Sequence, residues 1–257
     1  MIKLIREYIK YLLIAKQRHG VHSPFVYDFG DNCIHLPLPT EIIKQFSTLK
    51  KGFLNSREVI EVVDLGAGSK KLNTSRPVRK IAKVSGSNQK YGKLLYRLVA
   101  HYDLKNVLEL GTSLGLGTFM LASGNENVKV TSIEGCPNTY KFAKKHFPES
   151  LQHKVDFLNG SFVETIKNFK NKAPFDLIFI DGDHQKSSQI EQIELLAPYI
   201  HDETIIVLDD IRWSENMYEA WVYFVNHPDF HLSIDLFKMG IIMKRKHQQK
   251  EAFVIKY

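Results

Sequence analysis

Short apolar runs alternate with amphipathic segments from about residue 106 onward, and this alternation most constrains how the 257-residue chain can fold. Runs that are apolar on both faces and separated by helical patterns predict parallel strands, covered by helices on both sides of the sheet. The apolar runs are residues 107–110, 128–133, 155–158, 175–180 and 204–208. We therefore expect a doubly wound α/β fold with a mostly parallel, seven-stranded sheet.

The last two strands of this sheet are expected to differ from the others. Residues 230–237 and 239–244 are apolar runs that follow one another almost directly, with Lys238 and Gly240 near the join. Two runs joined this closely predict an antiparallel hairpin at the C-terminal end of the sheet.

The N-terminal part of the chain differs from the rest in charge. Residues 1–105 hold 19 Lys and Arg against 8 Asp and Glu, whereas residues 106–257 hold 16 against 20. The basic half could face an anionic substrate, a nucleic acid or a membrane surface, or it could be a solvated face without a partner. We expect a mainly helical extension over residues 1–87, acting as a lid or a homodimer contact, and a ligand-binding domain over residues 88–257.

Composition also bears on the compartment. No uncharged apolar stretch approaches the roughly 20 residues that span a bilayer. Lys3, Arg6 and Glu7 interrupt the N-terminal apolar residues, which predicts an amphipathic helix rather than a signal peptide. Cys33 and Cys136 are too few for a disulfide framework. We therefore expect a soluble, cytoplasmic protein.

A glycine-rich turn follows the first of the predicted parallel strands. Residues 107–117 read Val-Leu-Glu-Leu-Gly-Thr-Ser-Leu-Gly-Leu-Gly, so a strand end with an acidic residue leads through the turn into a helix. The dinucleotide fingerprint requires Gly-x-Gly-x-x-Gly, so that a pyrophosphate can sit on the helix N-terminus. Glu109, two residues before the first glycine, would repel a phosphate but suits a ligand with an ammonium group.

This motif resembles the first motif of the class I S-adenosylmethionine-dependent methyltransferases, acid-x-Gly-x-x-x-Gly. The resemblance implies S-adenosylmethionine as the cofactor. It also implies that Glu134 and Gly135, after the second strand, bind the ribose, and that Ser161 and Phe162, after the third, pack around the adenine. Asp181, at the end of the fourth strand, would also contact the cofactor. The first motif would contribute Glu109, Gly111, Thr112, Ser113, Gly115 and Gly117.

A second glycine motif lies upstream, at Gly66-Ala67-Gly68. The residues that follow it, 70–79, are basic and polar rather than an apolar helix, and no acidic strand end lies about 20 residues further on. We therefore expect a loop or hairpin of the N-terminal extension here, and not the cofactor turn.

Acidic residues end both the fourth and the fifth predicted strand. Asp181 ends the fourth strand, and Asp209 and Asp210 end the fifth. Neighbouring parallel strands bring their C-terminal ends together, so these carboxylates could ligate one hard cation such as Mg²⁺. Asp181 could instead cap the next helix.

These strand ends resemble the metal-dependent O-methyltransferases acting on catechols and caffeoyl thioesters, and also the macrocin-type sugar O-methyltransferases. The resemblance implies transfer of a methyl group to a small hydroxylated molecule, with Asp181 and His184 as catalytic residues and His184 taking the proton. Asp210 departs from the Asn of the first family, and His184 departs from its lysine base. His184 could equally be a hydrogen-bonded structural histidine.

Three other functions remain open at this point. An RNA or protein methyltransferase could dock its substrate through the basic half, although the fourth strand lacks the Asp/Asn-Pro-Pro-aromatic motif of enzymes that methylate exocyclic amines. The chain could be a binding module that retains the cofactor pocket without catalysis. Residues 1–17 could bind a membrane surface.

Overall fold

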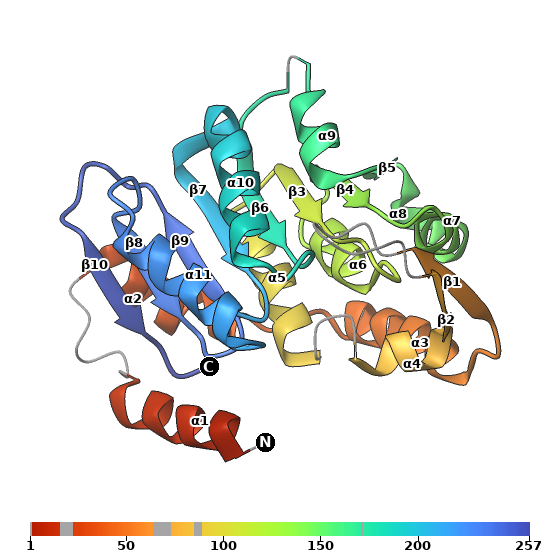
Figure 1. The fold of residues 1–257 in the computed structure, drawn as a ribbon, viewed down its shortest axis with the longest axis horizontal. Coiled ribbons are helices and arrows are strands. Elements are labelled where there is room, and N and C mark those ends of the chain that lie inside the picture. Colours follow the sequence, from red (N-terminus) through yellow and green to blue (C-terminus); the bar gives the residue numbers. More distant parts are fainter. Residues whose placement is uncertain (1, 16–22, 64–72, 85–88, 171) are drawn as a thin grey trace. The chain divides into compact units, whose positions relative to one another are not determined.

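The computed structural model describes residues 2–15, 23–63, 73–84, 89–170 and 172–257. These residues form two compact units, each described by itself. Unit 1 comprises Met1–Leu36 and Pro174–Tyr257, and unit 2 comprises Pro37–Ala173 (Figure 1). The extension expected over residues 1–87 contributes to both units, and its role as a lid or dimer contact stays a prediction.

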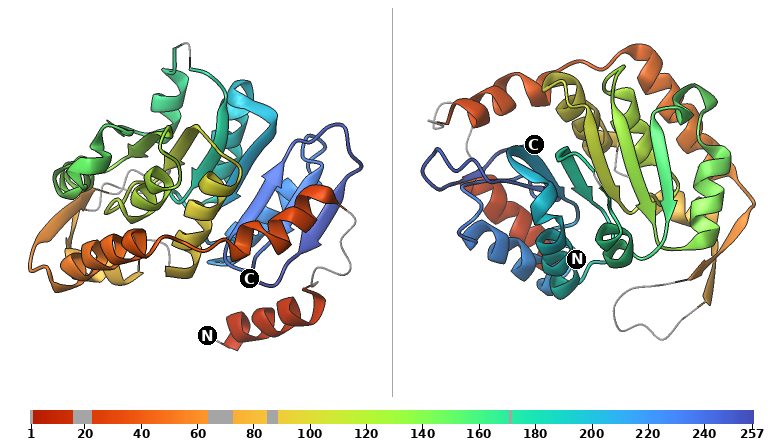
Figure 2. Two further views of the ribbon diagram at one scale, coloured as in Figure 1. Left: turned by 180° about the vertical axis from the view of Figure 1, so that it is seen from behind. Right: turned by 90° about the horizontal axis from the view of Figure 1, so that it is seen from above.

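Unit 2 is built on three parallel strands, β3 (Asn106–Leu110), β4 (Lys129–Glu134) and β5 (Val155–Asn159), which pair in this order. They lie side by side as the yellow-green to green arrows in Figure 2 (right). Helix α6 (Leu116–Ser123) follows the glycine turn, and its residues 116–122 are all buried, as an apolar sequence requires. The other helices of this unit are α3 (Thr40–Asn55), α4 (Val78–Val84), α5 (Gln89–His101), α7 (Pro137–His146), α8 (Glu149–Gln152) and α9 (Phe162–Lys167).

Two strands flank the upstream glycine motif in sequence. Strands β1 (Val59–Val63) and β2 (Asn73–Pro77) pair antiparallel. Gly66, Ala67 and Gly68 lie outside the described residues.

Unit 1 contains the remaining strands. Strands β6 (Phe175–Ile180) and β7 (Ile200–Leu208) are parallel. The predicted hairpin is confirmed, because β8 (Leu232–Asp235) and β9 (Gly240–Met243) are antiparallel and β9 pairs with β7. The seven expected strands are thus β3 to β9, and β10 (Glu251–Val254), parallel to β8, is an additional strand that the sequence reading missed.

Helices complete unit 1. A Cβ on Gly240 would run into the ring of Trp221, so glycine lets the hairpin pack closely against the helix that carries Trp221. Within the described part of the chain, no helix is long and apolar enough to cross a membrane. The helices of this unit are α1 (Ile2–Ile14), α2 (Pro24–Asp31), η2 (Cys33–His35), α10 (Lys186–Leu196), η3 (Ala197–Tyr199) and α11 (Glu215–Asn226).

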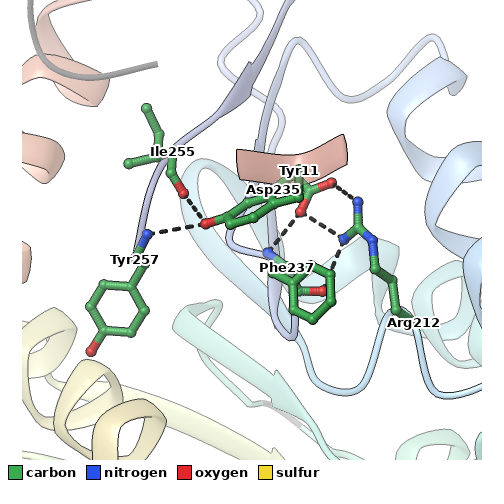
Figure 3. A network of polar contacts seen from close by, with 6 residues as sticks. All are labelled: Tyr11, Arg212, Asp235, Phe237, Ile255 and Tyr257. Atoms are coloured by element: carbon green, nitrogen blue, oxygen red, sulfur yellow. Dashed lines mark hydrogen bonds and ion pairs between the residues drawn. The ribbon is translucent and has the colours of Figure 1, made fainter. Parts of the chain in front are cut away.

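A buried ion pair fixes the loop after β7 to the β8–β9 hairpin (Figure 3). The guanidinium of Arg212 donates to both carboxylate oxygens of Asp235, at 2.8 and 2.6 Å, and to the carbonyl of Phe237 at 2.9 Å. The two side chains are only 10% and 9% exposed. The ring of Phe237 lies 5.1 Å from the guanidinium and 5.3 Å from the ring of Tyr11 in α1.

Replacing Asp235 tests how much this ion pair contributes. Asp235→Asn keeps the shape but leaves the Arg212 charge without its counter-ion, so the free energy of unfolding should fall by about 3–5 kcal/mol. Urea unfolding measures the loss. Glu164→Gln, which removes an exposed ion pair with Lys167, is the control and should change the stability by less than about 1 kcal/mol. Equal effects of the two substitutions would contradict the assignment.

Candidate active site

The glycine turn of unit 2 has the backbone conformation that its glycines predict. Gly111 and Gly115 have φ of 108° and 79°, in the region that side chains rarely adopt. Ser113, between them, has φ of 49°. Gly117 lies two residues after Gly115, buried at the start of α6.

Four N–H groups of this turn donate to other groups within the protein. Those of Gly111 and Thr112 donate to the carbonyl of Ile133, and that of Gly115 donates to the carbonyl of Thr112. The N–H of Ser113 donates to the Glu134 carboxylate at 2.9 Å. A turn that binds a pyrophosphate presents its N–H groups to the ligand instead. These four N–H groups are thus occupied within the protein, and the prediction that this is not a dinucleotide site stays a prediction.

Glu109 lies beneath the turn in a buried hydrogen-bond network. Its side chain accepts from the hydroxyls of Thr118 in α6, at 2.5 Å, and Ser132 in β4, at 2.6 Å. Ser132 also shares a 2.6 Å hydrogen bond with Thr112 of the turn. Burial raises the pKa of Glu109 to about 7, although both hydroxyl donors oppose the shift. The network thus ties strand, turn and helix together, and the sequence reading missed Thr118 and Ser132.

Glu134 ends β4 beside the same turn. Its two carboxylate oxygens accept from the N–H groups of Ser113 and Cys136, both at 2.9 Å, which fixes the side chain. Burial raises the pKa of Glu134, and these N–H donors oppose the shift. A carboxylate oxygen has more than one lone pair, so each can still accept a hydroxyl such as that of a ribose.

The ends of β4 and β5 lie together, as the predicted cofactor set requires. The side-chain amide of Asn159 donates to the carbonyls of Glu134 and Gly135, at 2.7 and 3.3 Å. Ser161 is the N-cap residue of α9, although its side chain makes no capping hydrogen bond. Phe162, the first residue of α9, is partly buried. Ten of the eleven residues predicted to bind the cofactor belong to unit 2, and their role in binding stays a prediction. The eleventh, Asp181, belongs to unit 1, and its cofactor contact stays a prediction.

The strand ends of unit 1 gather a second polar group. Asp181, His184 and Asp210 each offer one ligand atom, and these atoms lie within 4.8 Å of one another. Asp183 and Asp210 have φ of 50° and 53°, which turns the chain sharply after β6 and β7. Nδ1 of His184 is buried and has no hydrogen-bond partner among the described residues.

Asp209 is not brought into this group. Its side chain is 2% exposed and accepts the N–H of Asp210 at 2.8 Å. The ammonium of Lys238, in the β8–β9 hairpin, lies 3.4 Å from a carboxylate oxygen of each of Asp209 and Asp210. Burial, reinforced by the charge of Asp210, raises the pKa of Asp209, and Lys238 opposes this shift. The sequence predicted only that Lys238 lies near the join of the hairpin, and not that its ammonium faces these aspartates.

The two tryptophans have different environments. Trp221 is 4% exposed and belongs to the core, whereas Trp213 is 71% exposed. The ring centroids of Trp213 and His184 are 6.3 Å apart, so an exposed aromatic surface lies beside the Asp181–His184–Asp210 group.

Comparison with known proteins defines the class of this fold. Residues 108–211, which include the glycine turn and the ends of β4 to β7, match the model of a methyltransferase domain family. An O-methyltransferase from Bacillus cereus, solved with S-adenosylhomocysteine, superposes with a TM-score of 0.55 at 18% identity over 85% of this chain and 96% of that one. The fold is therefore that of the class I methyltransferases, as predicted.

Two curated relatives are similar to part of the chain. A catechol O-methyltransferase from Niastella koreensis is 29% identical over 124 residues, covering 47% of this chain and 55% of the relative. A tRNA1(Val) (adenine(37)-N6)-methyltransferase from a Flavobacteriaceae bacterium is 31% identical over 102 residues, covering 39% and 42%. The chain thus spans about half the length of the curated relatives it matches. These similarities confirm the predicted resemblance to the class I S-adenosylmethionine-dependent methyltransferases.

The raised pKa of Glu109 makes stability depend on pH. Its pKa rises from 4.5 in the unfolded chain to about 7 in the fold, so the folded chain binds the proton more tightly. Stability from this group is complete below pH 4.5 and is lost as the pH rises through 7, by about 3 kcal/mol. Urea unfolding from pH 5 to 8 should show this loss in the wild type and not in Glu109→Gln. An identical pH profile in Glu109→Gln would contradict it, and Glu164→Gln, an exposed site, controls for the removed charge.

Proposed function

We propose that this chain is an S-adenosylmethionine-dependent methyltransferase that methylates a hydroxyl oxygen of a small molecule. The observation that carries the proposal is the grouping of Asp181, His184 and Asp210 at the ends of β6 and β7, in a chain whose glycine turn matches a methyltransferase domain. Unit 2 would hold the methyl donor, and unit 1 would bind and activate the acceptor.

The residues of unit 2 fit S-adenosylmethionine. The cofactor supplies an electrophilic methyl group on a sulfonium. Glu134 would accept the ribose hydroxyls, because two backbone N–H groups hold its carboxylate in place. Phe162 would pack against the adenine. Glu109 would act indirectly, since its carboxylate is buried among hydroxyl partners and supports the turn from below.

The residues of unit 1 fit a divalent cation. Two carboxylates and an imidazole form the donor set, and the orphaned Nδ1 of His184 is the kind of buried atom that a ligand satisfies. Imidazole is a better ligand for Mn²⁺ or Zn²⁺ than for Mg²⁺, so a mixed set favours a transition metal over the Mg²⁺ expected from three aspartates. Such a cation, when bound, would lower the pKa of the acceptor hydroxyl.

Residues around this group would orient the acceptor and take up its proton. Asp181 and His184 are the groups that could receive the proton, each through a side-chain atom that does not ligate the cation, because both side chains lie at the site. The exposed ring of Trp213 offers a stacking surface for an aromatic acceptor such as a catechol. In-line methyl transfer then depends on alignment of the acceptor oxygen with the methyl group.

A tRNA or other RNA substrate is the second candidate, favoured by the similarity to a tRNA methyltransferase. The sequence after β6 argues against an adenine amine as acceptor, because it reads Asp-Gly-Asp-His rather than Asp/Asn-Pro-Pro-aromatic. Transfer of a tritiated methyl group to catechols, caffeoyl thioesters, sugars and bulk tRNA distinguishes the two. Label only in hydroxylated small molecules is expected, and label only in tRNA would overturn the proposal.

Cofactor binding can be measured without a substrate. S-adenosylhomocysteine at about 100-fold over its Kd should stabilise the fold by roughly 2.7 kcal/mol, which raises the Tm by about 5–10 °C. NAD⁺ at the same concentration should leave the Tm unchanged. No shift with S-adenosylhomocysteine at saturation would show that the glycine turn does not hold this cofactor.

Metal binding can be measured without turnover. Titration with Mn²⁺, followed by calorimetry, should give one site per chain, and Asp210→Asn and His184→Gln should each weaken it at least about tenfold. Asp229→Asn, an exposed site in unit 1, is the matched control and should bind as the wild type does. Unchanged Mn²⁺ affinity in His184→Gln would exclude this histidine as a ligand and leave it the role of a base.

A further inference from the structure

Helix α1 presents an exposed apolar stripe. Ile5, Ile9 and Leu13 follow one another at intervals of four residues and therefore lie on one face of the helix. They are 55%, 52% and 81% exposed, and Leu12 beside them is 39% exposed. Side chains of this kind are normally buried, so a stripe of four on one short helix indicates a surface that another partner covers.

The opposite side of α1 is fixed to unit 1. The hydroxyl of Tyr11 donates to the carbonyl of Ile255 at 2.5 Å and accepts the N–H of Tyr257 at 3.0 Å (Figure 3). The Tyr11 side chain is 1% exposed, and its ring and that of Tyr8 pack against Phe237. Because this side holds the helix in place, the stripe is left on the side that faces solvent.

The charges beside the stripe indicate what the partner is. Arg6 and Lys10 are exposed, and each lies three residues before an apolar residue of the stripe, Ile9 or Leu13. Their aliphatic stems can follow an apolar surface while their charges reach its polar boundary. The one acidic residue of the helix, Glu7, is already paired with Lys10 at 2.9 Å. A second copy of α1 would therefore bring like charges together without an acidic partner for Arg6.

We propose that α1 is a peripheral membrane-binding helix, which lies in the surface of an anionic lipid bilayer with Ile5, Ile9, Leu12 and Leu13 inserted. A helix that lies in a membrane surface combines a wide apolar face with Lys and Arg along its polar border, and anionic lipids attract those cations. The stripe shares no residue with the groups assigned to cofactor and metal, so the proposal does not depend on the proposed function.

Vesicle flotation of the full chain tests this proposal. The protein should float with phosphatidylcholine vesicles that contain phosphatidylglycerol, should float much less with phosphatidylcholine alone, and should be released by salt. Leu13→Glu should lower the partition coefficient about tenfold or more, because it places a charge in the inserted face. An unchanged Tm for Leu13→Glu, with and without S-adenosylhomocysteine, would confirm that the fold is intact.

Val84→Glu is the matched control, because Val84 is 82% exposed and lies outside α1. It should float as the wild type does. The proposal is wrong if the wild type stays unbound with the anionic vesicles, or if both substitutions reduce binding equally. It is also wrong if Leu13→Glu instead converts a dimer into a monomer, seen by light scattering without vesicle binding, since a second copy would then cover the stripe.

Discussion

The balance of charge at the ends of β6 and β7 is the constraint on which unit 1 depends. Asp181, Asp209 and Asp210 bring negative charges to one end of two neighbouring strands, and Lys238 is the cation that faces them. Burial alone would lower the pKa of Lys238, but the aspartates raise it above its usual value, so the ammonium stays charged. Lys238 therefore lies among three carboxylates and balances part of their negative charge. The buried Asp209 thus secures Lys238 while Asp210 faces His184.

The β8–β9 hairpin carries Lys238 to these aspartates, and Arg212 fixes that hairpin. Arg212 follows the aspartates in sequence and binds Asp235, at the end of β8, and the carbonyl of Phe237, next to Lys238 in the turn. The ring of Phe237 also packs against the rings of Tyr8 and Tyr11 in α1. The N-terminal helix and the acidic strand ends are therefore attached to the same turn, although they are far apart in sequence.

The sequence predicted most of the fold, and the chemistry that it assigns to each site stays a prediction. Periodicity located β3 to β9 because buried parallel strands are continuous apolar runs, and the hairpin followed from two runs that adjoin. Strand β10 was missed because its four residues pair at an edge and carry no long apolar run. The partners of Glu109 and the position of Lys238 depend on register and on a turn, which no local pattern encodes. The sequence also could not predict that Asp210, and not Asp209, joins Asp181 and His184. Both residues have the same side chain, and the positive φ of Asp210, which turns its side chain in a different direction, has no sequence signal.

The distribution of charge, rather than its total, connects these features. The chain carries a net charge of +7, yet both candidate ligand sites are lined with carboxylates. Acidic groups at the strand ends suit ligands that are themselves cationic, such as a sulfonium with an ammonium group or a divalent metal. The basic residues of α1 lie on a helix that precedes all the strands in the sequence. They suit an anionic surface instead. Under the two proposals, each sign of charge lies where a partner of the opposite sign would bind, whereas the net charge alone points only to an anionic partner.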